Sequence, residues 1–412
     1  MKRQLLFFLL SLVLGVPAMK AQDYFVNVEN WPVQQYLSEV TYNLSSLSKI
    51  EDYIGNSAYQ RLDYPNAFRL PLPWGMNEGL VLTYSANEDF SDSREIAVSD
   101  GDYEVPIYNL IPQCTYYYKL EDAFGNVVAE GTIQTRGRVR MIYAPSLQNV
   151  RDLGGWETED GRRIKYGKLY RGSELNGSVH ATQQDINMLL DLGIGAELDM
   201  RKAEEQDATL GVGYSSLGFS AEQGTYLNNL ENGCYSTHLF ADKYLDSYRK
   251  DFDFIMANLK AGRPVYMHCV YGADRTGMLA LLIEGMLGIS YDHMAKDYEL
   301  TSMSNWSGVR LKTRYFDSII RYMNRFSGST VQERIVSFLK SRVKMTNEEI
   351  DYLRSELLED TEQKSNDGGL TTSVEQPIQA AKSQSTAYDL TGRRIAAKRG
   401  IAVKNGRKYV VR

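Results

Sequence analysis

Cysteine and histidine are scarce in this chain of 412 residues, with three of the first and four of the second. The histidines lack the spacing of metal ligands, so we predict no metal and no cofactor. No basic stripe stands out against a net charge of −6, which argues against binding to nucleic acid or to an anionic membrane. Beyond the N-terminal leader no apolar stretch is long enough to span a bilayer. The oligomeric state is left open.

The first residues have the three parts of a secretory signal peptide. Two basic residues, Lys2 and Arg3, precede an apolar core from Leu5 to Val16, and small residues follow it. We therefore predict a signal peptide over residues 1–21 and a mature protein that is periplasmic, on the cell surface or secreted. A transmembrane signal anchor is the alternative.

Residues 22–138 show a strand pattern. Two runs typical of strands, Thr115–Leu120 and Val127–Ile133, are separated by a turn signal, and several short strands of this kind predict an all-β sandwich. Pro71–Trp74 and Leu110–Tyr118 loosely resemble a fibronectin type III module. Its tyrosines would form either a carbohydrate or peptide platform or, as we expect, part of the core and strand surface.

The stretch whose residues indicate a catalytic site most clearly comes later in the chain. An apolar run, Pro264–Met267, stops at His268 and Cys269, and a short loop leads into a helical pattern from Met278 to Ile283. This pattern predicts a strand, a loop and a helix. Backbone N–H groups of the loop and of the first helical turn would surround one tetrahedral oxyanion, which would lie over Cys269.

Cysteine is a strong nucleophile only as the thiolate, and its pKa falls at a helix N-terminus and beside a cation. Arg275 lies six positions after Cys269, so both can face one phosphate. We expect the sulfur to attack phosphorus while Arg275 holds the equatorial oxygens. If Cys269 stays reduced for this work, a bridge between Cys114 and Cys234 remains an open alternative. A buried structural cysteine and a sulfur carrier similar to rhodanese are the competing interpretations.

The string His268-Cys-x5-Arg-Thr-Gly277 resembles the signature loop of cysteine-dependent protein tyrosine phosphatases, and is most similar to that of the bacterial branch. The resemblance implies an α/β domain over residues 139–359, with a mainly parallel sheet flanked by helices. It also implies a substrate with a phosphate monoester, most often phosphotyrosine and sometimes a phosphoinositide, and an intermediate in which the cysteine carries the phosphoryl group.

By this resemblance the catalytic residues are Cys269, Arg275 and Asp274. The rest of the loop would bind phosphate, namely Val270, Tyr271, Gly272, Ala273, Thr276 and Gly277. Five further residues would support the loop, namely His268, Asp199, Arg201, Arg151 and Asp152.

For two pairs of these supporting residues, the sequence itself gives a reason to expect them near the loop. Asp199 and Arg201 end a predicted strand, and ligands of parallel sheets bind beyond the carboxyl ends of the strands. Arg151 and Asp152 belong to an Asn-x-Arg-Asp-Leu-Gly-Gly segment similar to one of the family. They would either brace the loop or form an ion pair that faces solvent.

Departure of the leaving group needs a proton donor, and two aspartates compete for this role. Asp274 lies inside the loop, where the bacterial branch has its proposed acid. Asp242 ends the irregular, glycine-rich insert of residues 203–250, roughly where other members of the superfamily have theirs. We favour Asp274. The insert itself is interpreted as a lid or substrate wall, with disorder as the alternative.

Ala273 stands where members active on phosphoinositides tend to have lysine, so a cation for a second phosphate is missing. We therefore expect monoesters similar to phosphotyrosine, and inositol phosphates, phytate included, are the second candidate. Arg162, Arg163 and Lys165 would supply charge from elsewhere. A phosphate-binding module without catalysis is the candidate from another class.

Helix and strand signals alternate around the loop. Thr182 begins a capped helix that runs to Gly193, a strand follows from Ile194, and Thr346 caps a helix from Ile350 to Leu358. This alternation predicts an α/β domain with a parallel sheet.

The chain ends in two segments of different composition. Residues 360–385 are polar without periodicity and are predicted to be a flexible linker. Residues 386–412 are predicted to be a small strand-rich tail. Through Tyr388–Ile395 and Gly406–Arg412 this tail resembles the C-terminal sorting domains of secreted Bacteroidetes proteins. It is either an address or a degenerate structural module.

Overall fold

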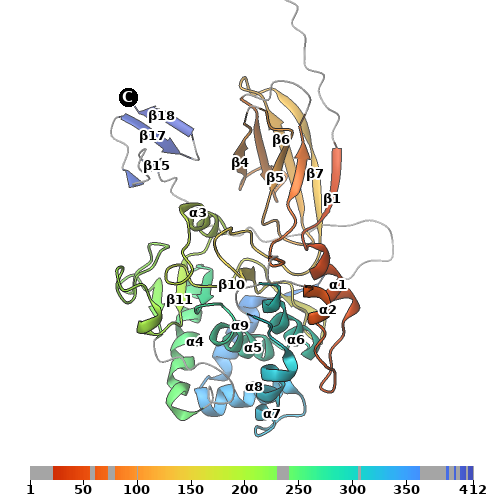
Figure 1. The fold of residues 1–412 in the computed structure, drawn as a ribbon, viewed down its shortest axis with the longest axis vertical. Helices are drawn as coiled ribbons and strands as arrows, with labels where there is room; N and C mark the ends of the chain where they lie inside the picture. Colours follow the sequence, from red (N-terminus) through yellow and green to blue (C-terminus); the bar gives the residue numbers. More distant parts are fainter. Residues whose placement is uncertain are drawn as a thin grey trace, which may run out of the picture. The chain divides into compact units, whose positions relative to one another are not determined.

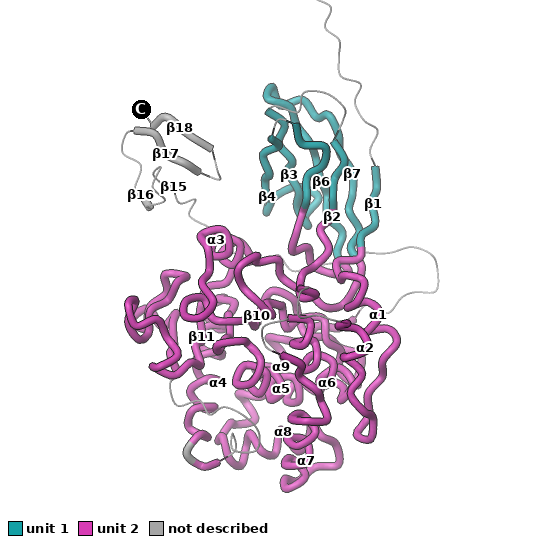
Figure 2. The backbone as a smooth tube through the Cα atoms, in the orientation of Figure 1, with its two compact units in different colours: residues 1–26, 69–106, 114–135 teal, residues 27–68, 107–113, 136–412 magenta. Residues whose placement is uncertain are grey.

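The computed structural model (Figure 1) describes residues 22–55, 61–72, 79–99, 101–229, 241–304 and 308–361, with four short strands between residues 387 and 411. The predicted signal peptide, most of the predicted linker, Trp74 and Cys234 lie outside the described residues. The chain divides into two compact units, coloured separately in Figure 2. Unit 1 contains residues 1–26, 69–106 and 114–135, and unit 2 contains residues 27–68, 107–113 and 136–412.

Unit 1 is built from β-strands. Its five-stranded sheet has the order β1-β7-β6-β3-β4, and β2 pairs with β5. The strands are β1 (Gln22–Asn27), β2 (Phe68–Pro71), β3 (Val81–Ser85), β4 (Arg94–Ala97), β5 (Glu104–Ile107), β6 (Thr115–Glu121) and β7 (Val127–Arg136). Burial alternates along β6, where Tyr116 and Tyr118 are buried. These tyrosines pack in the core, as expected, and do not form an exposed platform.

The structure divides the chain at residues 135 and 136, close to the predicted boundary at 138, but it corrects the prediction that the whole of residues 22–138 forms one β domain. Residues 27–68 belong to unit 2 and contain two helices, α1 (Trp31–Glu39) and α2 (Glu51–Ile54), where strands were predicted. Asn30 caps α1, a proline follows in its first turn, and Tyr36 is buried in the core of unit 2. An N-cap asparagine followed by proline is a helix start, which the strand pattern of the surrounding sequence obscured.

The main sheet of unit 2 has the order β12-β11-β13-β10-β8. Its strands are β8 (Arg151–Asp152), β10 (Leu169–Gly172), β11 (Ala196–Asp199), β12 (Tyr226–Asn228) and β13 (Val265–His268). All are parallel except β8, which runs antiparallel to β10, so the predicted α/β class and mainly parallel sheet are confirmed. Gly172, His268 and Asp199 lie side by side in register at the carboxyl ends of their strands.

Helices cover both faces of this sheet (Figure 1). They are α3 (Gln183–Asp191), α4 (Leu245–Lys260), α5 (Arg275–Leu287), α6 (Tyr291–Leu300), α7 (Asp317–Met323), α8 (Val331–Phe338) and α9 (Asn347–Leu357). Alternate residues of β13 face two core clusters, Val265 and Met267 toward the cluster of α4, α5 and α9, and Tyr266 toward that of α3. Every residue of α5 is buried, so this helix is the centre of the unit.

The capped helices that begin after Thr182 and Thr346 are confirmed, and both have capping boxes. The second helix ends at Leu357, because β14 (Leu358–Asp360) follows and pairs antiparallel with β9 (Arg162–Ile164).

The predicted strands of the tail are present as a sheet of order β16-β15-β17-β18. They are β15 (Ala387–Tyr388), β16 (Arg394–Ile395), β17 (Gly400–Lys404) and β18 (Arg407–Val411). No helix in the described part of the chain has the length and apolar character needed to cross a membrane.

One buried acid of α4 makes stability depend on pH. Asp251 is fully buried, accepts a hydrogen bond from Asn229 Nδ2 at 2.6 Å, and has its pKa raised by burial from 3.8 to about 8. A raised carboxyl pKa stabilises the fold fully below pH 3.8, and this contribution is lost as pH rises toward 8. The free energy of unfolding of Asp251→Asn, relative to that of wild type, should therefore rise by up to about 4 kcal/mol from pH 5 to pH 8. Urea unfolding of both proteins at the two pH values measures the gain, and a difference that does not change with pH would contradict it.

Candidate active site

The predicted loop joins β13 to α5 at the carboxyl edge of the sheet. Gly272 has a φ of 65°, in the left-handed region, and a Cβ there would meet the Gly172 carbonyl oxygen at 2.3 Å. Only glycine fits this position, because both the backbone conformation and the space exclude a side chain. The chain therefore passes closely over the end of β10 before α5 begins at Arg275.

Three N–H donors hold two carbonyl groups of the loop. Asn149 Nδ2 donates to the oxygens of Tyr271 and Gly272 at 3.1 Å each, and Arg171 Nη2 donates to that of Gly272 at 2.8 Å. In a trans peptide the N–H points opposite to the C=O, and no described peptide bond is cis. The N–H groups of Gly272 and Ala273 therefore point away from Asn149 and Arg171. Together with N–H groups of the first turn of α5, among them that of Thr276, which donates to Cys269, they can receive an oxyanion.

Cys269 follows β13 directly and is 3% exposed. Burial opposes ionisation of the thiol, but the charge of Arg275 and the hydroxyl and N–H of Thr276 outweigh it, so the pKa of Cys269 lies below its usual value. The sulfur is thus surrounded by groups that favour the thiolate, the form that attacks electrophiles.

The Arg275 guanidinium is held in one plane. Its Nη1 donates to Glu205 Oε2 at 2.6 Å and to the Met200 carbonyl at 2.7 Å, and its Nη2 donates to Glu205 Oε1 at 2.9 Å. Burial opposes ionisation of Glu205, but Arg275 holds the pKa of this carboxyl below its usual value. Glu205 therefore orients the guanidinium before any phosphate arrives.

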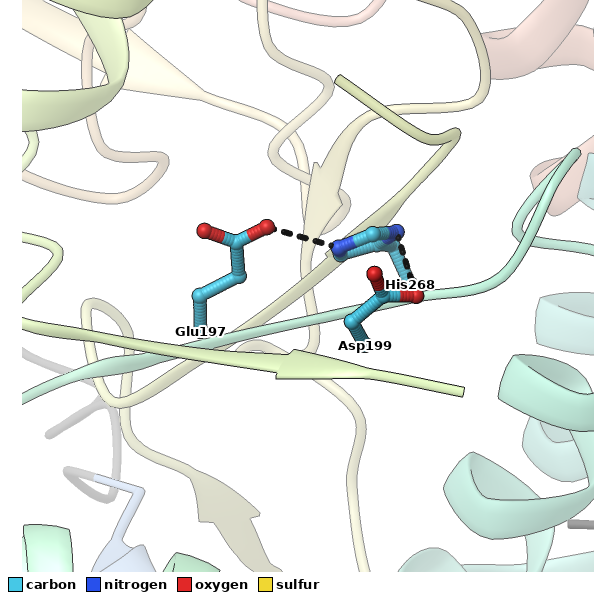
Figure 3. Close-up of side chains that lie close together, drawn as sticks. All are labelled: Glu197, Asp199 and His268. Carbon is cyan, nitrogen blue, oxygen red and sulfur yellow. Dashed lines mark hydrogen bonds and ion pairs between the residues drawn. The ribbon is translucent and has the colours of Figure 1, made fainter. Parts of the chain in front are cut away.

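His268 lies between two buried carboxylates that Figure 3 shows on either side of its ring. Its Nε2 is 3.0 Å from Glu197 Oε1 and its Nδ1 is 3.9 Å from Asp199 Oδ1. Burial opposes the imidazolium, but Asp199 and Glu197 raise the pKa of His268 above its usual value. The two carboxylates therefore favour the protonated ring and hold it in one orientation behind Cys269.

Asp199 and Arg201 extend this chain of charges. Arg201 donates to both oxygens of Asp199, at 2.9 and 2.7 Å, and its Nη1 donates to Glu174 Oε2 at 3.0 Å. Burial opposes the charge on Asp199, but His268 and Arg201 lower the pKa of this carboxyl. Glu174 in turn donates its N–H to the Val270 carbonyl at 3.0 Å, so the network reaches the loop.

Glu197, Asp199 and His268 have the spacing of metal ligands, with ligand atoms within 4.8 Å of one another. The carboxylate oxygens of Glu197 and Asp199 already bind the His268 imidazole and the Arg201 guanidinium, respectively. A divalent ion would have to displace these groups, so the arrangement is better described as a buried network of hydrogen bonds and ion pairs.

Arg151 supports the loop through Asn149. Its Nη1 donates to Asn149 Oδ1, and its Nε donates to Asp297 Oδ1 at 2.9 Å. Asp297 also binds Arg171, and the two arginines lower the pKa of its carboxyl to about 2 although burial opposes this. Asp152 instead accepts hydrogen bonds from the N–H groups of Gly154 and Gly167, at 2.8 and 2.7 Å, and from Arg140 Nη1 at 3.3 Å, and none of these groups belongs to the loop.

The two candidate acids lie in different surroundings. Asp274 stands at the N-cap of α5, and its carboxylate forms two hydrogen bonds of 3.1 Å with the Arg310 guanidinium. The negative charge of Asp274 opposes ionisation of the Cys269 thiol. Asp242 has 87% of its side chain exposed and pairs with Arg342. Within the described residues, no contact of Asp242 leads to the loop.

Three basic residues were expected to supply positive charge for a second phosphate of the substrate, but they bind groups away from the loop. Arg162 binds Asp160, Arg163 binds Glu359, and Lys165 donates to the carbonyls of Ser355 and Glu356.

Several residues of the site were not singled out from the sequence. They are Asn149, Arg171, Glu174, Glu197, Glu205, Asp297 and Arg310. Glu174 and Glu205 had a signal, since both follow closely on strands whose carboxyl ends meet at the loop. Arg310 had no such signal in the sequence, because it does not follow closely on any strand of the main sheet.

Comparison with known proteins is consistent with this geometry. Residues 142–359, more than half of the chain, match the tyrosine phosphatase family. A triple specificity protein phosphatase of Mycobacterium tuberculosis is 35% identical in an alignment of 236 residues that covers 48% of this chain and 80% of that protein. A tyrosine-protein phosphatase of Cupriavidus necator is 26% identical in an alignment of 191 residues that covers 43% of this chain and 68% of that protein.

Proposed function

The chain belongs to the tyrosine phosphatase family and is a phosphatase, and from this premise we propose that it hydrolyses phosphate monoesters, phosphotyrosine in proteins above all, through a phosphocysteine intermediate. The observation that carries the proposal is that one loop combines a thiol whose pKa is lowered by Arg275, oriented backbone amides and the clamped guanidinium of that arginine. A module that only binds phosphate does not agree with membership of this family.

In the first step the Cys269 thiolate attacks phosphorus, an S–P bond forms, and the bond from phosphorus to the ester oxygen breaks. The leaving oxygen takes a proton from Asp274. The amides of the loop and Arg275 stabilise the charge on the equatorial oxygens, because they are already in place.

In the second step water attacks phosphorus and gives a proton to Asp274, the S–P bond breaks, and inorganic phosphate leaves. The thiolate is restored without any oxidant or cofactor. Asp274 thus serves as acid and then as base.

Arg310 supports a second candidate, the hydrolysis of inositol phosphates. The chain lacks a lysine at position 273, but the Arg310 guanidinium lies beside Asp274, the next residue. The fork of an arginine suits two oxygens of a phosphate. On moving from Asp274 to a second phosphate of the substrate, Arg310 would also release the carboxyl for proton transfer.

The test is a panel of substrates for the purified full chain, namely a phosphotyrosine peptide, a phosphoserine peptide, phosphoinositide vesicles and phytate. We expect the highest kcat/KM for the phosphotyrosine peptide. Arg310→Gln should lower kcat/KM about tenfold more for phytate and phosphoinositides than for the peptide. Arg314→Gln, at an exposed arginine of the same segment, is the matched control. Highest turnover of phytate would put the second candidate first, and turnover of no substrate would contradict both.

Export completes the proposal. The composition of residues 1–21 supports a cleaved signal peptide, the strands of unit 1 support a module similar to fibronectin type III, and the strands of the tail support a sorting address. Fractionation of the native cells checks this, and an unprocessed chain in the cytoplasm would contradict it.

A further inference from the structure

A segment that precedes the family's domain contacts the active site. Residues 61–64, which we call the brace, lie in the part of unit 2 that comes before unit 1's main strands in sequence. Asp63 is 1% exposed, and its Oδ2 accepts the backbone N–H of Asn149 at 2.7 Å. The match to the tyrosine phosphatase family begins only at residue 142, so the brace lies outside the region that this match covers.

The brace is fixed by an internal ion pair and by contacts to two other segments. Arg61 grips Asp63 through two bonds of 2.9 Å each. The same guanidinium donates to the carbonyls of Pro145 and Leu147, at 3.0 and 2.5 Å. The N–H of Leu62 donates to the Met303 carbonyl at 3.0 Å. Asp63 is therefore a charged acceptor at a fixed place.

Asn149 needs such an acceptor. Its φ is 56°, in the left-handed region that residues with a side chain adopt at a cost and hold only when their surroundings determine it. From this conformation its side chain binds the carbonyls of Tyr271 and Gly272. A change in the backbone of Asn149 would therefore displace the donor that orients two amides of the phosphate site.

We propose that the brace completes the active site, with Asp63 as a positioning residue that acts on the phosphate-binding loop through Asn149. The inference rests on the proposed function of the loop. It makes the brace part of the catalytic apparatus, although the brace lies outside the residues that match the tyrosine phosphatase family. The loop of this protein is thus supported from the N-terminal side of the chain as well as from within the family domain.

The experiment compares full-length Asp63→Asn with wild type. The amide presents N–H groups to the donors of Arg61 and Asn149, while the size of the side chain is kept. Asp52→Asn is the matched control, since Asp52 lies in α2, shortly before the brace, with 67% of its side chain exposed. Three quantities are measured: the inhibition constant for vanadate, the rate at which iodoacetate alkylates Cys269, and kcat/KM for p-nitrophenyl phosphate.

We expect Asp63→Asn to raise the vanadate constant and lower kcat/KM about tenfold each, because one hydrogen bond to a charged group is lost. Alkylation should slow as well, and Asp52→Asn should match wild type in all three. A folded Asp63→Asn protein with the vanadate constant of wild type would overturn the proposal, even if its melting temperature fell.

A second variant keeps the test decisive if Asp63→Asn does not fold. Arg61→Gln leaves Asp63 and Asn149 in place but removes the grip on the carboxylate, and it should weaken vanadate binding by a smaller factor. An unchanged constant in Arg61→Gln would then overturn the proposal. Turnover of p-nitrophenyl phosphate by wild type, absent in Cys269→Ser, tests the proposed function separately from the brace.

Discussion

Cys269→Ser is expected to lower kcat about 10,000-fold or more with every substrate that the wild type hydrolyses. A serine hydroxyl at this position does not ionise near neutral pH, so the groups that lower the pKa of the thiol have no anion to produce. The folded protein should still bind vanadate, because Arg275 and the loop amides are unchanged. Steady-state kinetics and vanadate binding measure the two effects.

The matched control is Cys114→Ser, at a half-buried cysteine of unit 1. It should leave kcat and KM as in wild type. A Cys269→Ser protein that retains substantial turnover would show that another group attacks phosphorus, and the interpretation of the loop would have to be abandoned.

Asp274→Asn is expected to lower kcat about 100-fold to 1,000-fold while vanadate binding persists. The loss should depend on the leaving group. p-Nitrophenolate departs readily without a proton, whereas the phenolate of tyrosine needs one, so phosphotyrosine should lose more than p-nitrophenyl phosphate. Comparison of kcat for the two substrates, in wild type and variant, measures this difference.

Asp242→Asn is the control for this prediction. Its side chain is exposed and paired with Arg342, so its replacement should leave kcat within about twofold of wild type. A reversed result, with Asp242→Asn inactive and Asp274→Asn active, would mean that the insert moves over the loop during catalysis and would assign the acid to Asp242.

The features that the sequence predicted well are local. Cys269 and Arg275 lie six positions apart between a strand and a helix, so spacing and turn chemistry were enough to place them on one loop. The caps at Thr182 and Thr346 were predicted for the same reason, since a capping box spans only four residues.

The features that escaped prediction depend on contacts between distant segments. Glu205 and Arg275 are 70 positions apart, and Asn149 and Gly272 are 123 apart. Pairing of this kind is decided by tertiary packing, which local patterns do not encode. The placement of residues 27–68 in unit 2 has the same origin, because the strands of unit 1 interrupt unit 2 in the sequence.

The buried charges were hardest to foresee. A glutamate such as Glu197 or an aspartate such as Asp297 is expected at the surface from sequence patterns, yet both are buried, Glu197 beside His268 and Asp297 beside Arg151. The free-energy cost of burying each carboxylate is offset only because it binds a partner from another element. The loop therefore depends on a framework of ion pairs that becomes visible only in the folded chain.

The most direct measurement is the trapping of the covalent intermediate. Full-length enzyme is mixed with excess p-nitrophenyl phosphate, quenched in acid during turnover, digested and analysed by mass spectrometry. The peptide that contains Cys269 should carry one phosphoryl group, which is absent from Cys269→Ser. A phosphoryl group on any other residue, or turnover in which the Cys269 peptide stays unmodified while the thiol remains free to alkylation, would contradict nucleophilic attack by Cys269.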